Sequence, residues 1–191
     1  MQQKIIDFIG TRVELSIQEE ALCKKYFEPV LFPKNTIIEE EGQVPRYLYY
    51  IVSGYLRLFH YNEIGEELTT HINCPPGFFT SYTHFIQQTK SNENVACITD
   101  CELLRITKEN LDLFIKESIA MKDFSISVFQ ESIRYNENRS QELASLTGEE
   151  RYRRLIENYP DILQNVPIQY IASFLGMKPE SLSRIRRKII N

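Results

Sequence analysis

The chain has 191 residues, of which 42% are hydrophobic and 25% are charged, and its formal net charge is −4. This balance is typical of a globular protein, and a chain of this length can bury a sizeable core without disulfides. The four cysteines show no C-x-x-C spacing and no close Cys/His cluster, which argues against a structural zinc or an iron–sulfur site. The N-terminal segment is too polar for a signal peptide, and no apolar run reaches the roughly 18 residues that cross a bilayer. We therefore expect a cytoplasmic protein with reduced thiols that makes no membrane contact.

The charge is distributed unevenly along the chain. Residues 147–191 hold eight Lys and Arg against five Asp and Glu, a net charge of +3, whereas the rest of the chain has a net charge of −7. This asymmetry indicates two modules, of which the basic one would meet a polyanion. The alternative is a solvated helix face, and charge alone does not decide between the two.

The first half of the chain reads mainly as strands. Ser16 and Glu19 form a capping box that predicts a short helix, and residues 46–62, 66–72 and 96–106 are then strand-like. Four glycines, which we expect at turns with positive φ, follow one another at intervals of 11 or 12 residues: Gly42, Gly54, Gly65 and Gly77. Evenly spaced turns between short strands predict a β-barrel or sandwich.

After Thr107 the pattern becomes helical, with a short helix followed by a long one over residues 119–146. The long helix carries two apolar stripes: Met121, Phe124, Val128 and Tyr135 on one, and Ile126, Phe129, Ile133 and Leu143 on the other. Two stripes need two partners, which we interpret as the barrel and the same helix of a second chain. We assign homodimerisation to the first stripe, although the pattern leaves open which stripe is the seam. A wholly intramolecular core is the alternative.

A second capping box, Thr147 with Glu150, marks a hinge and the start of a helix that ends before Pro160. The chain thus divides into a sensor barrel with short flanking helices (1–118), a connecting and dimerisation helix (119–146) and a basic domain (147–191).

The basic domain contains the pattern of a helix–turn–helix. Ala172 allows a close helix approach, Gly176 ends the first helix, and Pro179 suits the first turn of the second. Leu182, Ile185 and Ile189 then form its buried face, so that the opposite face of the helix is left for recognition. The candidate DNA-binding residues are Lys178, Pro179, Glu180, Ser181, Ser183, Arg184, Arg187 and Lys188.

These residue types suit contacts with double-stranded DNA. Arg184 can bind guanine O6 and N7, and Glu180 can accept a hydrogen bond from cytosine N4. Arg186, Arg187 and Lys188 are expected to hold the phosphate backbone.

A barrel, a long helix and a helix–turn–helix in this order resemble the Crp/Fnr family of bacterial transcription regulators. The sensor segment around Gly42, Tyr49, Ile51 and Gly54 is similar to that family's G-x6-Y-x-I-x-x-G signature, and the residues from Glu180 to Arg184 resemble its E-x-x-S-R recognition helix. The resemblance implies an α+β fold with an antiparallel jelly-roll barrel of the cyclic-nucleotide-binding type. It also implies base reading by Glu180, Ser183 and Arg184, a homodimer on a palindromic promoter site, and action on RNA polymerase.

The chain departs from the family pattern at three places. Thr80-Ser81 stands where cyclic-nucleotide binders carry Gly-Glu, and Ser91-Asn92 stands where they carry Arg-Ser, so cyclic AMP is not expected. Only Cys23 lies where the iron–sulfur members have a cysteine cluster, and neither that cluster nor haem is expected. Few residues follow the recognition helix, which implies that some phosphate contacts made by a C-terminal wing are absent.

Aromatic residues are concentrated in the segment from Gly77 to Phe85, where they indicate either core filling or a pocket for an apolar effector. The candidate pocket residues are Phe78, Phe79, Ser81, Tyr82, His84, Ser91 and Asn92. No nucleophile–base motif, phosphate-binding glycine loop or metal-ligand spacing occurs, so we expect no catalytic or metal site. Cys97 and Cys101 are expected on one strand face, as buried thiols or as a redox pair. The alternative to a DNA-binding regulator is a ligand-binding or protein-interaction module whose terminal helices are only structural.

Overall fold

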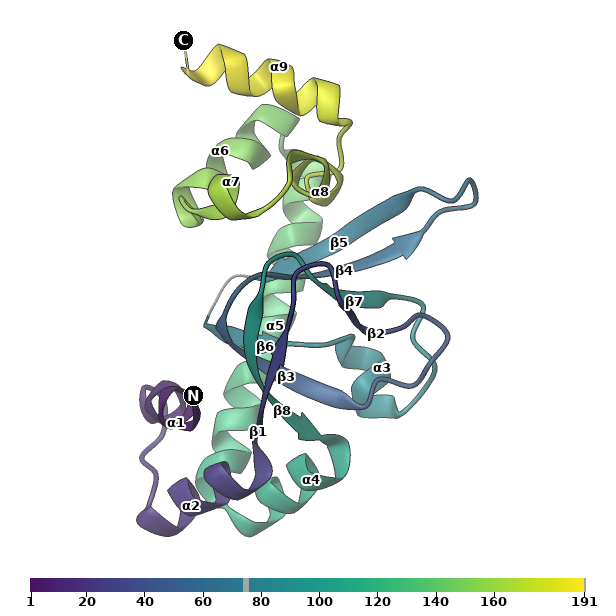
Figure 1. Cartoon of the computed structure of the whole chain (residues 1–191). Coiled ribbons are helices and arrows are strands. Elements are labelled where there is room, and N and C mark those ends of the chain that lie inside the picture. Colours follow the sequence, from purple (N-terminus) through teal and green to yellow (C-terminus); the bar gives the residue numbers. More distant parts are fainter. Residues whose placement is uncertain (74–75, 191) are drawn as a thin grey trace.

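The computed structural model describes residues 1–73 and 76–190, so Cys74 and Asn191 lie outside the described residues. The strands are β1 (Glu28–Phe32), β2 (Ile37–Glu39), β3 (Tyr47–Ser53), β4 (Leu56–Tyr61), β5 (Glu67–Asn73), β6 (Gly77–Phe79), β7 (Asn94–Cys97) and β8 (Cys101–Thr107). In the described part of the chain they form two four-stranded antiparallel sheets, ordered β1-β8-β3-β6 and β2-β7-β4-β5 (Figure 1). The expected α+β class with an antiparallel jelly roll is confirmed.

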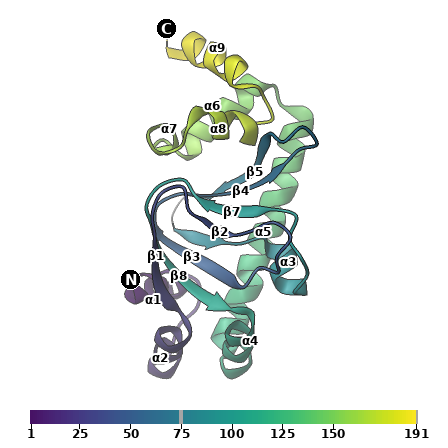
Figure 2. The same ribbon diagram turned by 45° about the vertical axis from the view of Figure 1, so that its right-hand side comes forward.

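Helices flank this roll and continue beyond it. They are α1 (Gln2–Gly10), α2 (Ile17–Tyr26), α3 (Tyr82–Gln87), α4 (Lys108–Glu117), α5 (Ile119–Ser145), α6 (Gly148–Asn158), α7 (Ile162–Asn165), α8 (Ile168–Phe174) and α9 (Pro179–Ile190). Helices α1, α2 and α4 lie at one end of the roll, and α5 runs from there past the sheets to α6–α9 at the opposite end (Figures 1 and 2). Within the described residues, no helix is both long and apolar enough to cross a bilayer.

Both predicted capping boxes are present. The side chain of Ser16 accepts from the Glu19 backbone N–H at the start of α2, and Thr147 accepts from Glu150 at the start of α6. Each cap satisfies an N–H group that has no partner within its helix. These caps place the two helix starts where the sequence predicts them.

The turn between β3 and β4 depends on Gly54. Its φ is 95°, and a Cβ at this position would lie 2.5 Å from the Asp100 carbonyl oxygen and 2.6 Å from Cys101 Sγ. Gly42 and Gly65 also have positive φ, as expected. The expectation is wrong for Gly77, which is not among the positive-φ residues because it pairs with Ile51 as the first residue of strand β6.

The core of the sensor has two layers. One lies between the sheets and includes Tyr49, Ile51 and Leu103, and the other lies between the first sheet and the helices. This second layer contains Phe114 and Phe124 together with the side chains of Ile5, Ile6 and Ile9 from α1. Helix α1 is therefore part of the sensor core.

The expectation that Cys97 and Cys101 share one strand face is wrong. Cys97 ends β7 in one sheet, and Cys101 begins β8 in the other, with a three-residue connection between them. Both thiols are free and buried, and each is 2% exposed. The chain changes sheets at this point, which a periodicity of two residues does not reveal.

Candidate nucleic-acid interface

Helices α8 and α9, the predicted helix–turn–helix, are joined by a tight turn. Gly176 has a φ of 67°, a left-handed conformation that favours glycine, and the Met177 N–H donates to the Ala172 carbonyl at 3.0 Å. Ala172 is fully buried, so α9 packs close to α8 at the crossing. The predicted roles of Ala172 and Gly176 are confirmed.

The apolar side of α9 faces the rest of the domain. Leu182 is 0% exposed, and Ile185 and Ile189 are half-buried against a cluster that includes Tyr152 and Ile171. Burial of three branched side chains on one face fixes the rotation of the helix about its axis. The opposite face must then point to solvent.

The outward face carries the candidate DNA-binding residues. Those that are exposed are Lys178, Pro179, Glu180, Arg184, Arg187 and Lys188, whereas Ser181 and Ser183 are half-buried. Arg184 Nη2 donates to Ser181 Oγ at 3.3 Å, and Arg187 Nε donates to the Ser183 carbonyl at 3.4 Å. These local bonds orient two guanidinium groups along the surface of the helix.

Arg186 differs from these outward cations. Its residue is half-buried, and its Nε atom is shielded from solvent with no hydrogen-bond partner in the described part of the chain. A half-buried guanidinium is badly placed to meet a phosphate, so the expected backbone contact suits Arg187 and Lys188 better than Arg186.

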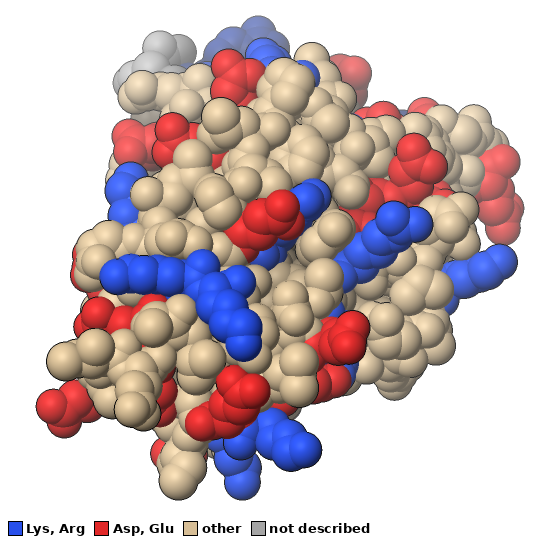
Figure 3. Space-filling model, turned by 60° about the horizontal axis from the view of Figure 1, so that its bottom comes forward, with Lys and Arg blue, Asp and Glu red and all other residues tan. Residues whose placement is uncertain are grey.

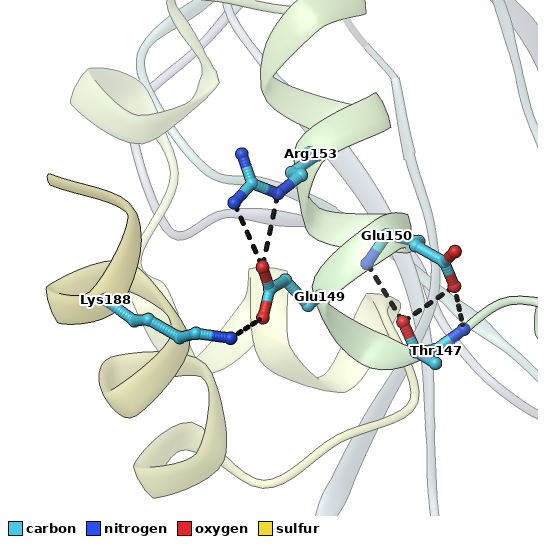
Figure 4. A network of polar contacts seen from close by, with 5 residues as sticks. All are labelled: Thr147, Glu149, Glu150, Arg153 and Lys188. Carbon is cyan, nitrogen blue, oxygen red and sulfur yellow. Dashed lines mark hydrogen bonds and ion pairs between the residues drawn. The ribbon is translucent and has the colours of Figure 1, made fainter.

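Lys188 belongs to an ion-pair network at the start of α6 (Figure 4). Its Nζ lies 2.9 Å from Glu149 Oε2, and Arg153 Nη2 lies 3.0 Å from Glu149 Oε1. Hydrogen bonds from Lys188 and Arg153 lower the pKa of Glu149. The sequence reasoning missed Glu149, because the two helices that bring it to Lys188 are far apart in the chain.

At the opposite end of the molecule from α9, acidic and basic side chains are more evenly mixed than on α9 (Figure 3). Acidic and basic side chains are interspersed on the face seen in Figure 3, which brings the lower end of the Figure 1 view forward. In α9, by contrast, the outward cations outnumber the single outward acid, Glu180. The basic character of the chain is thus concentrated on this helix, although the whole chain has a net charge of −4.

The candidate effector-pocket residues do not surround one cavity. Phe78 and Tyr82 line a hollow of about 20 Å³ between the first sheet and α5, together with Phe124 and Phe129. This is room for about one water molecule, whereas ligand pockets usually hold 300–1,000 Å³. Phe79 points to the other side of the strand, into the core between the sheets.

The polar candidates form a separate cluster around Glu93, a residue that the sequence reasoning missed. Thr70 Oγ1 donates to Glu93 Oε1 at 2.7 Å, and Ser81 Oγ donates to Glu93 Oε2 at 3.2 Å. Ser91 accepts from the Glu93 backbone N–H at 3.0 Å. The carboxylate therefore occupies the hydroxyl donors of Thr70 and Ser81 and places a negative charge among them.

Asn92 is exposed, His84 is half-buried, and the two side chains pair with each other. His84 Nε2 lies 3.1 Å from Asn92 Oδ1, and His84 Nδ1 lies 3.2 Å from Thr89 Oγ1. Both nitrogens of the ring are thus engaged at the surface. These two residues are not brought together with Phe78 and Tyr82.

The assignment of Met121 and Phe124 to a dimer seam needs correction. They are 1% and 2% exposed and lie in the sensor core of their own chain, so a second chain cannot reach them. Val128 is half-buried against the same core, and only Tyr135 of the first stripe is exposed. The second stripe is more open: Ile126, Ile133 and Leu143 are 45%, 59% and 43% exposed.

Known proteins share both sequence and fold with this chain. Residues 29–118 match the family model of the cyclic nucleotide-binding domain. The chain is 30% identical over 96 residues to the cyclic AMP receptor protein of Thermus thermophilus, a match covering 50% of this chain and 44% of that protein. It therefore aligns with less than half the length of this relative.

Solved structures extend the likeness over most of the chain. FixK2 from Bradyrhizobium japonicum has a TM-score of 0.73 at 15% identity, covering 85% of this chain and 84% of that one. The global regulator CLP of Xanthomonas campestris has a TM-score of 0.66 at 17% identity, covering 91% of each chain. The catabolite activator protein of Thermus thermophilus has a TM-score of 0.58 at 21% identity, with coverages of 95% and 86%. At these identities the likeness shows a shared fold.

The names of these relatives describe a receptor protein and a global regulator. Residues 29–118 thus match the cyclic nucleotide-binding domain, part of the chain is similar in sequence to the cyclic AMP receptor protein of Thermus thermophilus, and the chain has the fold of FixK2 and the catabolite activator protein.

Proposed function

We propose that this chain is a transcription regulator that binds a palindromic site in double-stranded DNA as a homodimer. The observation that carries this proposal is the outward face of α9, where Lys178, Arg184 and Arg187 are exposed while Leu182 is fully buried. An exposed basic helix following a tight turn is the arrangement that enters a major groove.

Within this face, the residues divide into two groups. Arg184 reads a guanine and Glu180 a cytosine, because both side chains lie on the exposed first turns of the helix. Lys178, Arg187 and Lys188 hold phosphates. Ser181 and Ser183 orient the two arginines, because the Ser181 hydroxyl accepts from Arg184 and the Ser183 carbonyl accepts from Arg187. Lys188 has to leave Glu149 to do so.

The homodimer forms through the second stripe of α5. Ile126 and Ile133 of this stripe, and Ile119 one heptad before them, follow one another at seven-residue intervals on the helix, and all three are exposed. A heptad spacing of exposed apolar residues is the pattern of a two-stranded coiled coil. A two-fold dimer matches the symmetry of a palindrome. Action on RNA polymerase is part of this proposal through the likeness to the receptor and activator proteins.

The sensor does not bind cyclic AMP in this proposal. Ser91 and Asn92 are neutral where the cyclic phosphate would need a cation, and the Glu93 carboxylate accepts a hydrogen bond from another candidate pocket residue, Ser81. A cyclic phosphate placed near this carboxylate without a paired cation would be destabilised by several kcal/mol, on the order of the penalty for an unpaired buried charge. The aromatic filling around Phe78 and Tyr82 supports the same conclusion.

The competing function is a ligand-binding or protein-interaction module with a purely structural helix pair. It differs from the DNA-binding proposal in one respect: the face of Glu180, Arg184 and Arg187 could then be covered. All three residues are exposed, which favours DNA binding.

The test begins with the purified full chain and fragmented genomic DNA, from which bound sites are selected and footprinted. Binding to the best site is then compared between the wild type, Arg184→Ala and a matched control, Arg105→Ala, which removes a guanidinium from the sensor. Loss of the Arg184 contact should weaken that site by about 1–3 kcal/mol and relax the preference at one base pair. Absence of salt-sensitive binding by the wild type to any fragment would refute the proposal.

A further inference from the structure

The DNA-reading domain rests directly on the sensor of its own chain. Helix α8 lies against the hairpin of β4 and β5 in both views (Figures 1 and 2). Ile72 and Ile98 of the sensor share a buried cluster with Ile171 and Phe174 of α8. An apolar contact of this kind holds two parts together but does not by itself fix their angle, because it is not directional.

A directional contact is made by Arg57 on β4. Its residue is only 5% exposed, and its guanidinium lies 3.9 Å from the ring centre of Phe59 and 3.7 Å from that of Tyr170. Tyr170 belongs to α8, so the cation is shared between an aromatic ring of the sensor and one of the basic domain (residues 147–191), which we call the reader. Stacking of a flat guanidinium restricts both the position and the tilt of the ring that it meets.

Arg57 is itself held from the sensor side. Its Nη2 lies 2.5 Å from Glu67 Oε2, and its Nη1 donates to Thr69 Oγ1 at 3.3 Å. With Phe59 on one side and these two groups at its edge, the guanidinium has a fixed orientation. The sensor therefore presents a rigid platform to Tyr170.

A second directional contact lies one helical turn along α8. The Thr69 backbone N–H donates to Ser173 Oγ at 2.8 Å. Tyr170 and Ser173 are three residues apart and so lie on one side of the helix. Two contacts from one side of α8 determine its rotation as well as its position.

The placement of α8 is passed on to α9. The Gly176 turn and the buried Ala172 and Leu182 join the two helices closely, so that α9 follows α8. In a dimer on a palindrome, the two recognition helices must meet half-sites about one helical turn of DNA, roughly 34 Å, apart. The angle between sensor and reader sets this spacing if the sensors belong to a fixed dimer.

We propose that Arg57, a sensor residue with no place on the DNA-contacting face, is a positioning residue for DNA recognition. Through Tyr170, and together with the Thr69–Ser173 bond, it fixes the spacing and tilt of the two α9 helices in the ligand-free dimer. This inference rests on the proposed DNA-binding function, but it makes a separate prediction. Loss of the platform should change which half-site spacing is accepted and leave the reading of a single half-site intact.

The test uses the full chain and the DNA site selected by the wild type. Affinity is measured for that site, for versions with one base pair added or removed between the half-sites, and for a single half-site. One base pair rotates the half-sites by about a tenth of a turn. We expect the affinity of the wild type to fall about tenfold when one base pair is added or removed. Arg57→Met and Tyr170→Leu should bind the original site about fivefold more weakly than the wild type does. A change of spacing should then lower the affinity of these two variants by less than about threefold.

The matched control is Arg105→Met. Arg105 also stacks on a tyrosine, with its guanidinium 4.4 Å from the ring centre of Tyr47, and it pairs with Glu28, but these partners all lie within the sensor. This variant should keep the wild-type affinity and the wild-type spacing penalty. Single half-site affinity should be the same in all variants, which separates positioning from damage to the reading face.

Ser173→Ala provides a test if the other variants fail to fold, since it removes only one hydroxyl from α8 and changes no sensor residue. It should shrink the spacing penalty about twofold, in the same direction as Tyr170→Leu. Wild-type spacing penalties in folded Arg57→Met, Tyr170→Leu and Ser173→Ala would overturn the inference. Absence of DNA binding by the wild type would instead overturn the proposed function itself.

Discussion

Lys188 Nζ lies 2.9 Å from Glu149 Oε2, so a cation near the end of α9 is already paired within the chain. Lys188 is 73% exposed, and ion pairs between exposed side chains contribute little to stability. The pair can therefore open when a phosphate competes for the ammonium group.

The first prediction concerns this pair. Glu149→Gln removes the negative charge and frees Lys188 and Arg153, so DNA affinity should rise roughly two- to fivefold. The slope of log affinity against log salt should steepen by about 0.9 for each freed cation that meets a phosphate. Fluorescence anisotropy across a salt series measures both effects. Glu102→Gln, an equal charge change on the sensor, should change neither the affinity nor the salt slope. Equal behaviour of the two variants would contradict the role of Lys188 as a phosphate contact.

The dimer seam gives a second prediction. If the proposed dimer forms, Ile126→Glu or Ile133→Glu should convert it to a folded monomer, because these side chains are exposed in the single chain and lie at the proposed seam. Sedimentation at micromolar concentration, with circular dichroism to check the fold, measures this. Met121→Glu is the contrasting variant: it buries an unpaired charge, costs several kcal/mol and should unfold the sensor. A wild-type chain that is monomeric at this concentration would contradict the proposed dimer.

Gly54 provides a third prediction, on stability. Gly54→Ala should lower the free energy of unfolding by about 2–4 kcal/mol, because the new methyl group would overlap the Asp100 carbonyl and Cys101 Sγ. Gly65→Ala is the control, since its φ is 79° but no atom lies within 4 Å of the added Cβ. It should cost only about 1 kcal/mol of backbone strain. Urea denaturation of both variants checks the difference, and equal losses would show that the steric contact is relieved.

A fourth prediction follows from His71 in β5. Its Nε2 lies 3.2 Å from Asn136 Oδ1 of α5, and its Nδ1 is buried without a hydrogen-bond partner among the residues described. Burial lowers the pKa of His71. The unfolded chain therefore binds a proton more readily, and stability is lost as the pH falls below the ordinary histidine value of about 6.5 towards the lowered one.

The size of this loss is about 1.4 kcal/mol for each unit by which the pKa is lowered. Thermal unfolding between pH 7.5 and pH 5.5 should show a smaller decrease in His71→Asn than in the wild type. His60→Asn, on the neighbouring strand, should behave as the wild type. An unchanged pH dependence in His71→Asn would show that other groups cause it.

The fifth prediction is weak or absent binding of cyclic AMP and cyclic GMP. Calorimetry should give dissociation constants well above 10 μM, which corresponds to about −7 kcal/mol. The reason is that Ser91 and Asn92 are neutral, while the hydroxyl of Ser81 is bonded to the Glu93 carboxylate. Glu93→Gln alone should not restore tight binding, because no guanidinium is supplied. Micromolar affinity in the wild type would show that another cation, such as Lys90, meets the phosphate.

The local elements of this protein could be predicted well from its sequence. Strands on either side of Ser53-Gly54 follow from their β-branched and aromatic residues, and the start of α6 follows from Thr147 and Glu150. The turn before α9 follows from Gly176. These signals lie within a few residues of the structure that they determine. Helix α1 was missed, although Ile5, Ile6 and Ile9 form a helical stripe that would have indicated it.

Contacts between distant segments could not be predicted. The stripe of Met121 and Phe124 was recognised as apolar, but periodicity does not say which partner covers it, and the partner is the sensor core. Glu149 and Lys188 meet only because α6 packs beside α9, and Arg57 meets Tyr170 only because α8 docks on β4. The reading of DNA by Arg184 and Glu180 stays a prediction.

The apolar cluster between sensor and reader also affects how the chain unfolds. Ile72 and Ile98 are 8% and 2% exposed, and the residues that cover them come from the basic domain. A sensor cut off after Leu146 would present these two side chains to water and become prone to self-association. Since each part shields the other, the barrel and the helix–turn–helix should melt together in one cooperative transition rather than as independent units.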